Sequence, residues 1–214
     1  MILSYDSKTR MKIICIAKNY KAHASEMNDP IPSEPIFFLK PDSALLQKNQ
    51  PFYYPDFSNN VHYELELVVK INRLGKNISE RFAKNYYNEI ALGIDFTARD
   101  LQQNARTSGN PWALSKGFDG SAALSPFIDI ATLDKSVDNL DFYLLKNGLK
   151  VQQANTNEML FGVDTLIAYI SQYMTLKIGD FIYTGTPSGV GAVQIGDKLE
   201  GFLDNKSLLF CEIK

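Results

Sequence analysis

The chain has 214 residues, and 22 Lys and Arg against 24 Asp and Glu give a formal net charge of −2. This length suits one domain with a sizeable core, and 45% hydrophobic with 21% charged residues is typical of a globular protein. The charge gives no electrostatic footprint for nucleic acid, and no apolar run reaches the roughly 18–20 residues of a membrane span. Cys15 and Cys211 fit small buried hydrophobic residues in a reduced compartment, so we expect a cytoplasmic protein.

Short apolar or alternating runs predict strands along most of the chain. In order, they cover residues 11–16, 36–39, 61–71, 89–95, 141–151, 181–184, 198–203 and 208–213. The pair Asn147-Gly148 between alternating residues is a strong hairpin signal, and a turn at 204–206 joins the last two strands. Residues 1–11 are expected to form an N-terminal extension, with Met11 as an alternative start, before a single domain over 12–214.

Three helices complete the predicted elements, over residues 19–26, 98–106 and 165–173. Thr97 is the expected N-cap of the second, with Gly109 just past its end, and Asp164 is the expected N-cap of the third. The Pro-rich stretch 30–35 is the expected long loop, because proline fixes φ and removes a donor. The sum is an α+β fold that is predominantly β, with a few short helices.

Two glutamates, with one residue between them, lie within the predicted strand 61–71. Alternate side chains of a strand share a face, so Glu64 and Glu66 would lie about 7 Å apart on one side. Like charges at that spacing repel unless solvent or a cation compensates. Two interpretations stay open: the polar outer face of a half-solvated strand, or two oxygen ligands of a hard divalent cation.

Asp95 is a candidate third ligand. It ends an apolar run, and a carboxylate at the end of a buried strand costs desolvation energy unless it is paired. A helix cap or a partner arginine is the alternative to a metal. Three carboxylates without a Cys or His cluster would favour Mg²⁺ or Mn²⁺ over Zn²⁺.

Other polar features are compatible with catalysis as well as with an ordinary structural role. His23 and Glu26 share a helix face, so the carboxylate can hold one ring nitrogen while the other moves a proton; a solvated face has the same spacing. Lys116 is either a surface lysine or a lone cation of a site, and His62 is interpreted as structural. The Gly-rich run 184–191 fits a turn or a loop that grips a substrate carboxylate.

Six short motifs follow one another along nearly the whole chain. They are Asn19-Tyr20-x-x-His23-x-x-Glu26, Phe38-Leu39-Lys40-Pro41, Glu64-x-Glu66, Asp95-x-Thr97-Ala98-Arg99-Asp100-Leu101-Gln102, Lys116-Gly117-Phe118-Asp119 and Thr184-Gly185-Thr186-Pro187-x-Gly189-Val190-Gly191. Together and in this order they resemble the fumarylacetoacetate hydrolase family. Within it, the chain is similar to the small single-domain acylpyruvase and oxaloacetate decarboxylase members.

The resemblance implies a fold, an assembly and a set of site residues. The fold would be the mixed β-sandwich roll of the family's C-terminal domain, usually a homodimer. The implied metal ligands, for Mg²⁺ or Mn²⁺, are Glu64, Glu66 and Asp95. The implied catalytic residues are His23 with Glu26 as an acid/base pair on a lid segment, and Lys116 facing the reacting centre. The implied substrate-binding residues are Lys18, Tyr20, Gln102 and Thr186; Lys18 stands where many small members have arginine.

The resemblance also implies a reaction. The expected enzyme is a metal-dependent hydrolase that cleaves a C–C bond of acylpyruvate-type 2,4-dioxo acids through a metal-stabilised enolate, with His23 activating water. The alternatives on the same site are an oxaloacetate decarboxylase or tautomerase and a 2-hydroxyhepta-2,4-diene-1,7-dioate isomerase. A non-catalytic β-rich binding module is the hypothesis from another class. The expected partner is a small 2-oxo acid, with no nucleic acid and no membrane.

Overall fold

A computed structural model describes residues 11–27, 29–47 and 49–214, so the predicted extension lies outside the described residues apart from Met11. Its helices are α1 (Lys21–Glu26), α2 (Arg99–Ser108), α3 (Ala113–Lys116) and α4 (Val163–Tyr173). Its strands are β1 (Ile13–Ala17), β2 (Ile36–Lys40), β3 (Leu45–Gln47), β4 (Val61–Tyr63), β5 (Leu65–Ile71), β6 (Tyr87–Asp95), β7 (Thr97–Ala98), β8 (Ala122–Leu124), β9 (Ile128–Asp129), β10 (Asp141–Lys146), β11 (Leu149–Asn155), β12 (Phe181–Tyr183), β13 (Gly191–Ala192), β14 (Lys198–Leu203) and β15 (Lys206–Glu212). The predominantly β fold with short helices is therefore confirmed.

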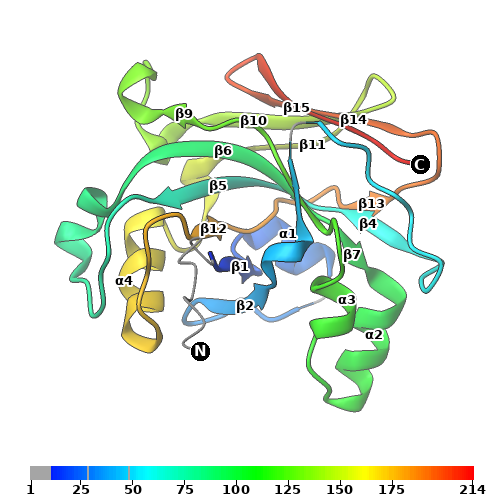
Figure 1. The fold of residues 1–214 in the computed structure, drawn as a ribbon, viewed down its shortest axis with the longest axis horizontal. Helices are drawn as coiled ribbons and strands as arrows, with labels where there is room; N and C mark the ends of the chain where they lie inside the picture. Colours follow the sequence, from blue (N-terminus) through cyan, green and yellow to red (C-terminus); the bar gives the residue numbers. More distant parts are fainter. Residues whose placement is uncertain (1–10, 28, 48) are drawn as a thin grey trace, which may run out of the picture.

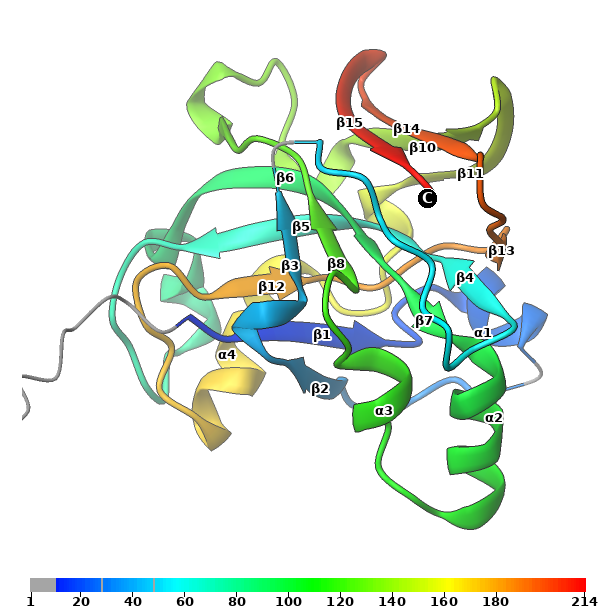
Figure 2. The ribbon, with the colours of Figure 1, turned by 45° about the vertical axis from the view of Figure 1, so that its right-hand side comes forward.

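The strands form three curled sheets. The largest runs β2-β1-β12-β5-β6-β8-β3, with β9 paired to β6; it is mixed, because β1 and β12 are parallel while β5 and β6 are antiparallel. The sheet β11-β10-β14-β15 lies over the long strands β5 and β6, and α2 and α3 project together from the opposite side (Figures 1 and 2). The third sheet, β13-β4-β7, is small and lies beside the start of β5.

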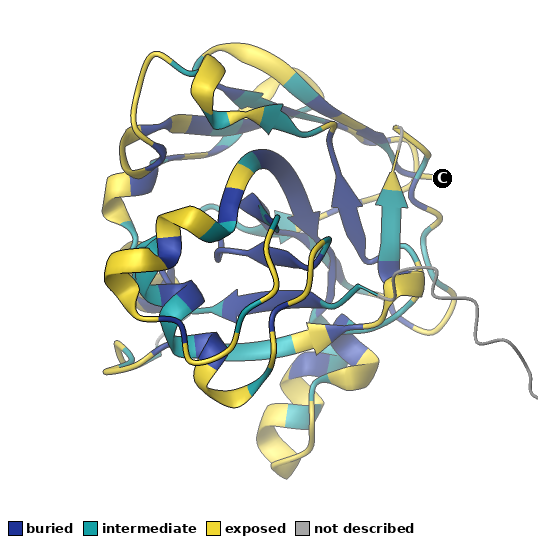
Figure 3. Cartoon of the chain, turned by 60° about the vertical axis from the view of Figure 1, so that its left-hand side comes forward, coloured by how far each residue is buried: buried dark blue, intermediate teal, exposed yellow. Residues whose placement is uncertain are grey.

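The predicted strand over 61–71 is two strands. Residues before Glu64 pair with β13 and β7, and residues after it pair with β12 and β6, so the chain changes sheets at this glutamate. Leu65 and Leu67 lie in the main core, whereas Val68 lies in a second apolar cluster on the other face, with Cys15 and others. Because both faces are covered, the interpretation as a half-solvated strand is wrong. Figure 3 shows these buried strands inside a shell of exposed loops and helices.

Local signals in the sequence were correct for turns and wrong for helix caps. Asn147 and Gly148 have φ of 54° and 81°, as a two-residue hairpin turn requires, and Gly109 ends α2 in the left-handed region. However, α2 begins after Ala98, because the hydroxyl of Thr97 bonds to the Asp95 carbonyl instead. The N-cap of α4 is Gly162, and Asp164 accepts a hydrogen bond from Tyr87.

Two predictions about the environment of the chain can be compared with the described residues. Cys15 and Cys211 are free and buried, as expected for small hydrophobic side chains. Among the described helices, none has the length and apolarity needed to cross a membrane.

Candidate active site

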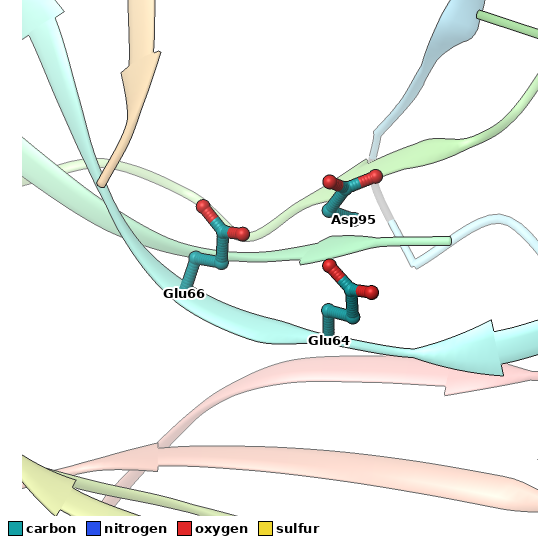
Figure 4. Close-up of side chains that lie close together, drawn as sticks. All are labelled: Glu64, Glu66 and Asp95. Carbon is teal, nitrogen blue, oxygen red and sulfur yellow. The ribbon is translucent and has the colours of Figure 1, made fainter. Parts of the chain in front are cut away.

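Three carboxylates meet where β5 and β6 run side by side. Glu64 and Glu66 flank the first residue of β5, and Asp95 is the last residue of β6; the Asp95 N–H donates to the Glu64 carbonyl at 2.9 Å. One carboxylate oxygen of each lies within 4.8 Å of those of the other two, and each residue is at most 5% exposed. Figure 4 shows the three side chains directed at one space. The structure therefore brings the predicted ligands together.

Two buried lysines and the half-buried Arg99 compensate two of these carboxylates. The Nζ of Lys116 lies 2.9 Å from Glu64 Oε2 and 2.7 Å from Asp95 Oδ2, Arg99 contacts the other oxygen of Glu64, and Lys40 lies 2.8 Å from Asp95 Oδ1. Burial acts to raise the pKa of Glu64, but Lys116 and Arg99 outweigh it and hold this pKa well below its usual range. Burial likewise acts to lower the pKa of Lys116, yet Asp95 and Glu64 raise it.

Glu66 is the carboxylate that lacks such a partner. None of the ion pairs among the described residues involves it, and its Oε2 accepts a hydrogen bond from the Gly185 N–H at 2.8 Å. Burial, then the charges of Asp95 and Glu64, raise its pKa well above the usual range. A buried carboxylate without a counter-charge is costly, so this corner of the cluster favours binding of a further cation. An all-oxygen donor set suits a hard divalent ion.

The predicted acid/base pair lies on α1. His23 Nδ1 is 3.1 Å from Glu26 Oε2, and the other oxygen of Glu26 accepts the Gly189 N–H at 3.0 Å. His23 is 7% exposed and lines the same cavity as Glu64 and Asp95. Because Nδ1 of His23 is hydrogen-bonded to Glu26, the other ring nitrogen is available for proton transfer in the cavity.

That cavity collects most of the predicted catalytic and substrate-binding residues. Besides the two carboxylates, its walls include Lys18, His23, Gln102, Lys116 and Thr186. Tyr20 is placed differently: it is 1% exposed, and its ring packs edge-on against Phe142 in the core, with 6.3 Å between centroids. The structure thus gives Tyr20 a packing position, just before α1 begins.

Several charged residues of the site had no role assigned from the sequence. Arg99 and Lys40 belong to two of the six motifs, but nothing in the local sequence indicates that both contact the carboxylates. Arg106 also lines the cavity and pairs with Asp29, which lies 3.2 Å from Lys18 Nζ. These contacts join segments far apart in the sequence, so only the tertiary fold reveals them.

His62 lies next to the cluster without joining it. Its Nε2 is 2.9 Å from Asn60 Oδ1, and burial, followed by the nearby Arg99, lowers its pKa to about 4. The imidazole is therefore neutral at physiological pH.

The sequence model of the fumarylacetoacetate hydrolase C-terminal family matches residues 12–214, nearly the whole chain. The chain belongs to the fumarylacetoacetate hydrolase family. Members of this family include tautomerases, decarboxylases and hydrolases, and the resemblance seen in the six motifs is confirmed.

Three relatives illustrate the range of reactions in the family. The mitochondrial oxaloacetate decarboxylase of Dictyostelium discoideum is 42% identical over 90% of this chain and 88% of its own length. The oxaloacetate tautomerase of Escherichia coli is 38% identical over 92% of this chain and 90% of its own length. One solved structure is that of fumarylpyruvate hydrolase from Pseudomonas aeruginosa in complex with Mn²⁺ and pyruvate. It aligns with a TM-score of 0.90 at 33% identity, and the alignment covers 95% of this chain and 89% of that chain.

Proposed function

We propose that this chain is a divalent-metal-dependent enzyme that interconverts the enol and keto forms of oxaloacetate, or decarboxylates it. The observation that carries the proposal is a cluster of three buried carboxylates, two of which line one cavity together with an acid/base histidine and several cations. The relatives named for oxaloacetate chemistry support this reaction over the acylpyruvate hydrolysis expected from the sequence.

The cations of the cavity suit a dicarboxylic substrate. Lys18, Arg99 and Arg106 all line it, and guanidinium groups bind carboxylates with two parallel hydrogen bonds. Gln102, whose Oε1 accepts from Arg99 at 2.6 Å, holds that guanidinium in place. Arg99 already pairs with Glu64, and Lys18 and Arg106 with Asp29, so a dianionic 2-oxo acid would compete with these carboxylates for the cations that orient it.

Proton transfer falls to His23. In tautomerisation its free ring nitrogen takes a proton from the carbon next to the keto group and delivers it to the resulting enolate oxygen, and the reverse path moves it back, while Glu26 stabilises the imidazolium that forms in between. In decarboxylation the bond to the distal carboxylate breaks, CO2 leaves, and the protonated His23 delivers a proton to the enolate carbon. Glu64, Glu66 and Asp95 would hold Mg²⁺ or Mn²⁺, which supplies Lewis-acid polarisation of the substrate oxygens. Lys116, kept protonated by its carboxylate neighbours, adds positive charge where negative charge develops.

Hydrolysis of an acylpyruvate is the second candidate. The structural likeness to the Pseudomonas fumarylpyruvate hydrolase favours it, because the two chains share fold and length. In that reaction His23 would deprotonate a water molecule instead of a carbon acid, so the same residues serve both reactions.

The test is a direct comparison of substrates. We would follow loss of enol-oxaloacetate by its ultraviolet absorption, pyruvate release with a coupled dehydrogenase, and cleavage of acetylpyruvate and fumarylpyruvate. Each assay would be run with Mg²⁺, with Mn²⁺ and with excess chelator. We expect chelator-sensitive turnover that is fastest on oxaloacetate. Faster cleavage of an acylpyruvate would establish the second candidate, and no turnover of any of these substrates would overturn both.

A further inference from the structure

A closed ring of hydrogen bonds holds the backbone between the two metal-binding glutamates. Leu65, which separates Glu64 from Glu66, donates its N–H to Gln152 Oε1 at 2.9 Å and accepts the Thr186 hydroxyl on its carbonyl at 2.9 Å. Gln152 Nε2 closes the ring by donating to Thr186 Oγ1 at 2.9 Å. Gln152 lies on β11 of the other large sheet and is 1% exposed.

This ring of hydrogen bonds lies beside the part of β5 that has no paired strand on the β12 side. β12 ends at Tyr183, opposite Val68, so the edge of β5 from Leu65 to Leu67 continues without that neighbour. Thr184 and Thr186 satisfy the Leu67 and Leu65 carbonyls, and Gln152 satisfies the Leu65 N–H. A buried backbone donor without a partner would be costly, so Gln152 supplies what a neighbouring strand would supply elsewhere.

The same glutamine also holds the loop behind the acid/base pair. Its Nε2 donates a second hydrogen bond to the Pro187 carbonyl at 3.1 Å. Two residues on, Gly189 packs on β11 so closely that an added Cβ would lie 2.2 Å from the Val151 carbonyl oxygen. The N–H of Gly189 then donates to Glu26, the partner of His23.

We propose that Gln152 is a positioning residue that sets both halves of the active site from one buried amide. Its acceptor oxygen fixes the spacing of Glu64 and Glu66, and its donor nitrogen fixes the loop that orients Glu26. A corollary concerns Thr186: its single hydroxyl proton is used by the Leu65 carbonyl, so the hydroxyl links the loop to β5 and does not donate to substrate. The kinetic part of this inference rests on the proposed function, whereas the metal-binding part does not.

The experiment compares adjacent glutamines on one strand. Gln153 is exposed and its Oε1 accepts from Lys150, so Gln153→Ala is the matched control for Gln152→Ala. The first readout is Kd for Mn²⁺ from calorimetry without substrate, and the second is kcat and KM at saturating metal. In Gln152→Ala we expect Kd to rise about 10- to 100-fold, as for other groups that orient metal ligands, with Gln153→Ala unchanged.

Gln152→Glu separates the two halves of the proposal. The carboxylate keeps an acceptor for the Leu65 N–H but loses the donors to Thr186 and Pro187. Because the acceptor is kept and the added negative charge attracts a cation, we expect a smaller rise in Kd for Mn²⁺ than in Gln152→Ala, together with a lower kcat. Should Gln152→Ala fail to fold, Gln152→Glu and Thr186→Val carry the test, because Thr186→Val removes the hydroxyl with little change of shape.

The outcomes are distinguishable. If the Gln152 variants that fold, and Thr186→Val, keep the Kd and kcat/KM of Gln153→Ala, the proposal is wrong. If Kd rises but kcat at saturating metal is unchanged, the loop half is wrong. An unmodified protein that turns over none of the 2-oxo acids, with the Kd difference intact, would overturn the proposed function and leave the positioning of the metal ligands supported.

Discussion

The carboxylate half and the histidine half of the site are built in contrasting ways. Glu64, Glu66 and Asp95 lie on or beside paired strands with both sheet faces covered, and each is at most 5% exposed. His23 and Glu26 lie on a six-residue helix without a side-chain cap, and the side chain of Glu26 is 33% exposed. The contrast indicates that the fold itself positions the proposed metal ligands, whereas the proposed acid/base pair depends on a few hydrogen bonds that substrate binding would adjust.

The largest expected effect comes from removing the unpaired carboxylate. Because burial, Asp95 and Glu64 raise the pKa of Glu66, the stability contributed by its protonated form is lost as the pH rises from the ordinary carboxyl pKa through the raised one. The neutral variant Glu66→Gln should therefore melt a few degrees higher than the unmodified protein at neutral pH without metal. It should also lose turnover and the rise in melting temperature on adding Mg²⁺. Calorimetric scans with and without Mg²⁺ measure both, and an unchanged response to Mg²⁺ would contradict the three-carboxylate site.

The next effect separates the two halves. His23→Ala should lower kcat by about 10²- to 10⁴-fold through loss of proton transfer, while Mg²⁺ still raises the melting temperature as before. Glu26→Gln is the matched variant: it keeps a hydrogen-bonding group and should cost less activity. Equal loss of turnover and of metal stabilisation in His23→Ala would show that the histidine belongs to the metal centre.

The smallest effect tests the rim of the cavity. Lys18 has a positive φ of 57° and pairs with Asp29, and Lys18→Arg would offer a two-pronged donor in its place. We expect a few-fold change in the ratio of kcat/KM for oxaloacetate to that for acetylpyruvate, which has a single carboxylate. An unchanged ratio would show that Lys18 does not contact the substrate carboxylate.

The sequence predicted what depends on local spacing. Three features are visible within a few residues, and the structure places them as expected. They are Glu64 and Glu66 with one residue between them, Asp95 at a strand end, and the Asn147-Gly148 turn. The change of sheets at Glu64 could not be foreseen, because it depends on which distant strands pair on either side. Thr97 likewise lies in β7, paired with His62 of β4, so it does not cap α2.

Most of the charge balance in the site was also hidden from the sequence. Thr97 was expected to cap a helix, but Lys116, brought in by α3, donates to its hydroxyl. Lys40 and Arg99 are recognisable as charged motif residues, yet their burial beside carboxylates results from packing between elements. Gln152 carried no signal at all, since one of two adjacent glutamines in a hairpin reads as an ordinary surface residue.

Lys40 also affects local unfolding of the protein. It lies on β2, an edge strand, and edge strands are usually among the first elements to fray. Its ammonium, however, contacts the carbonyls of Phe96, Lys116 and Ser121 as well as Asp95. Detaching β2 would take Lys40 away from one oxygen of the buried Asp95 and leave the carbonyls of Phe96, Lys116 and Ser121 without this donor. Exchange of the β2 amides that are hydrogen-bonded to β1 should therefore be slower than is usual for an edge strand.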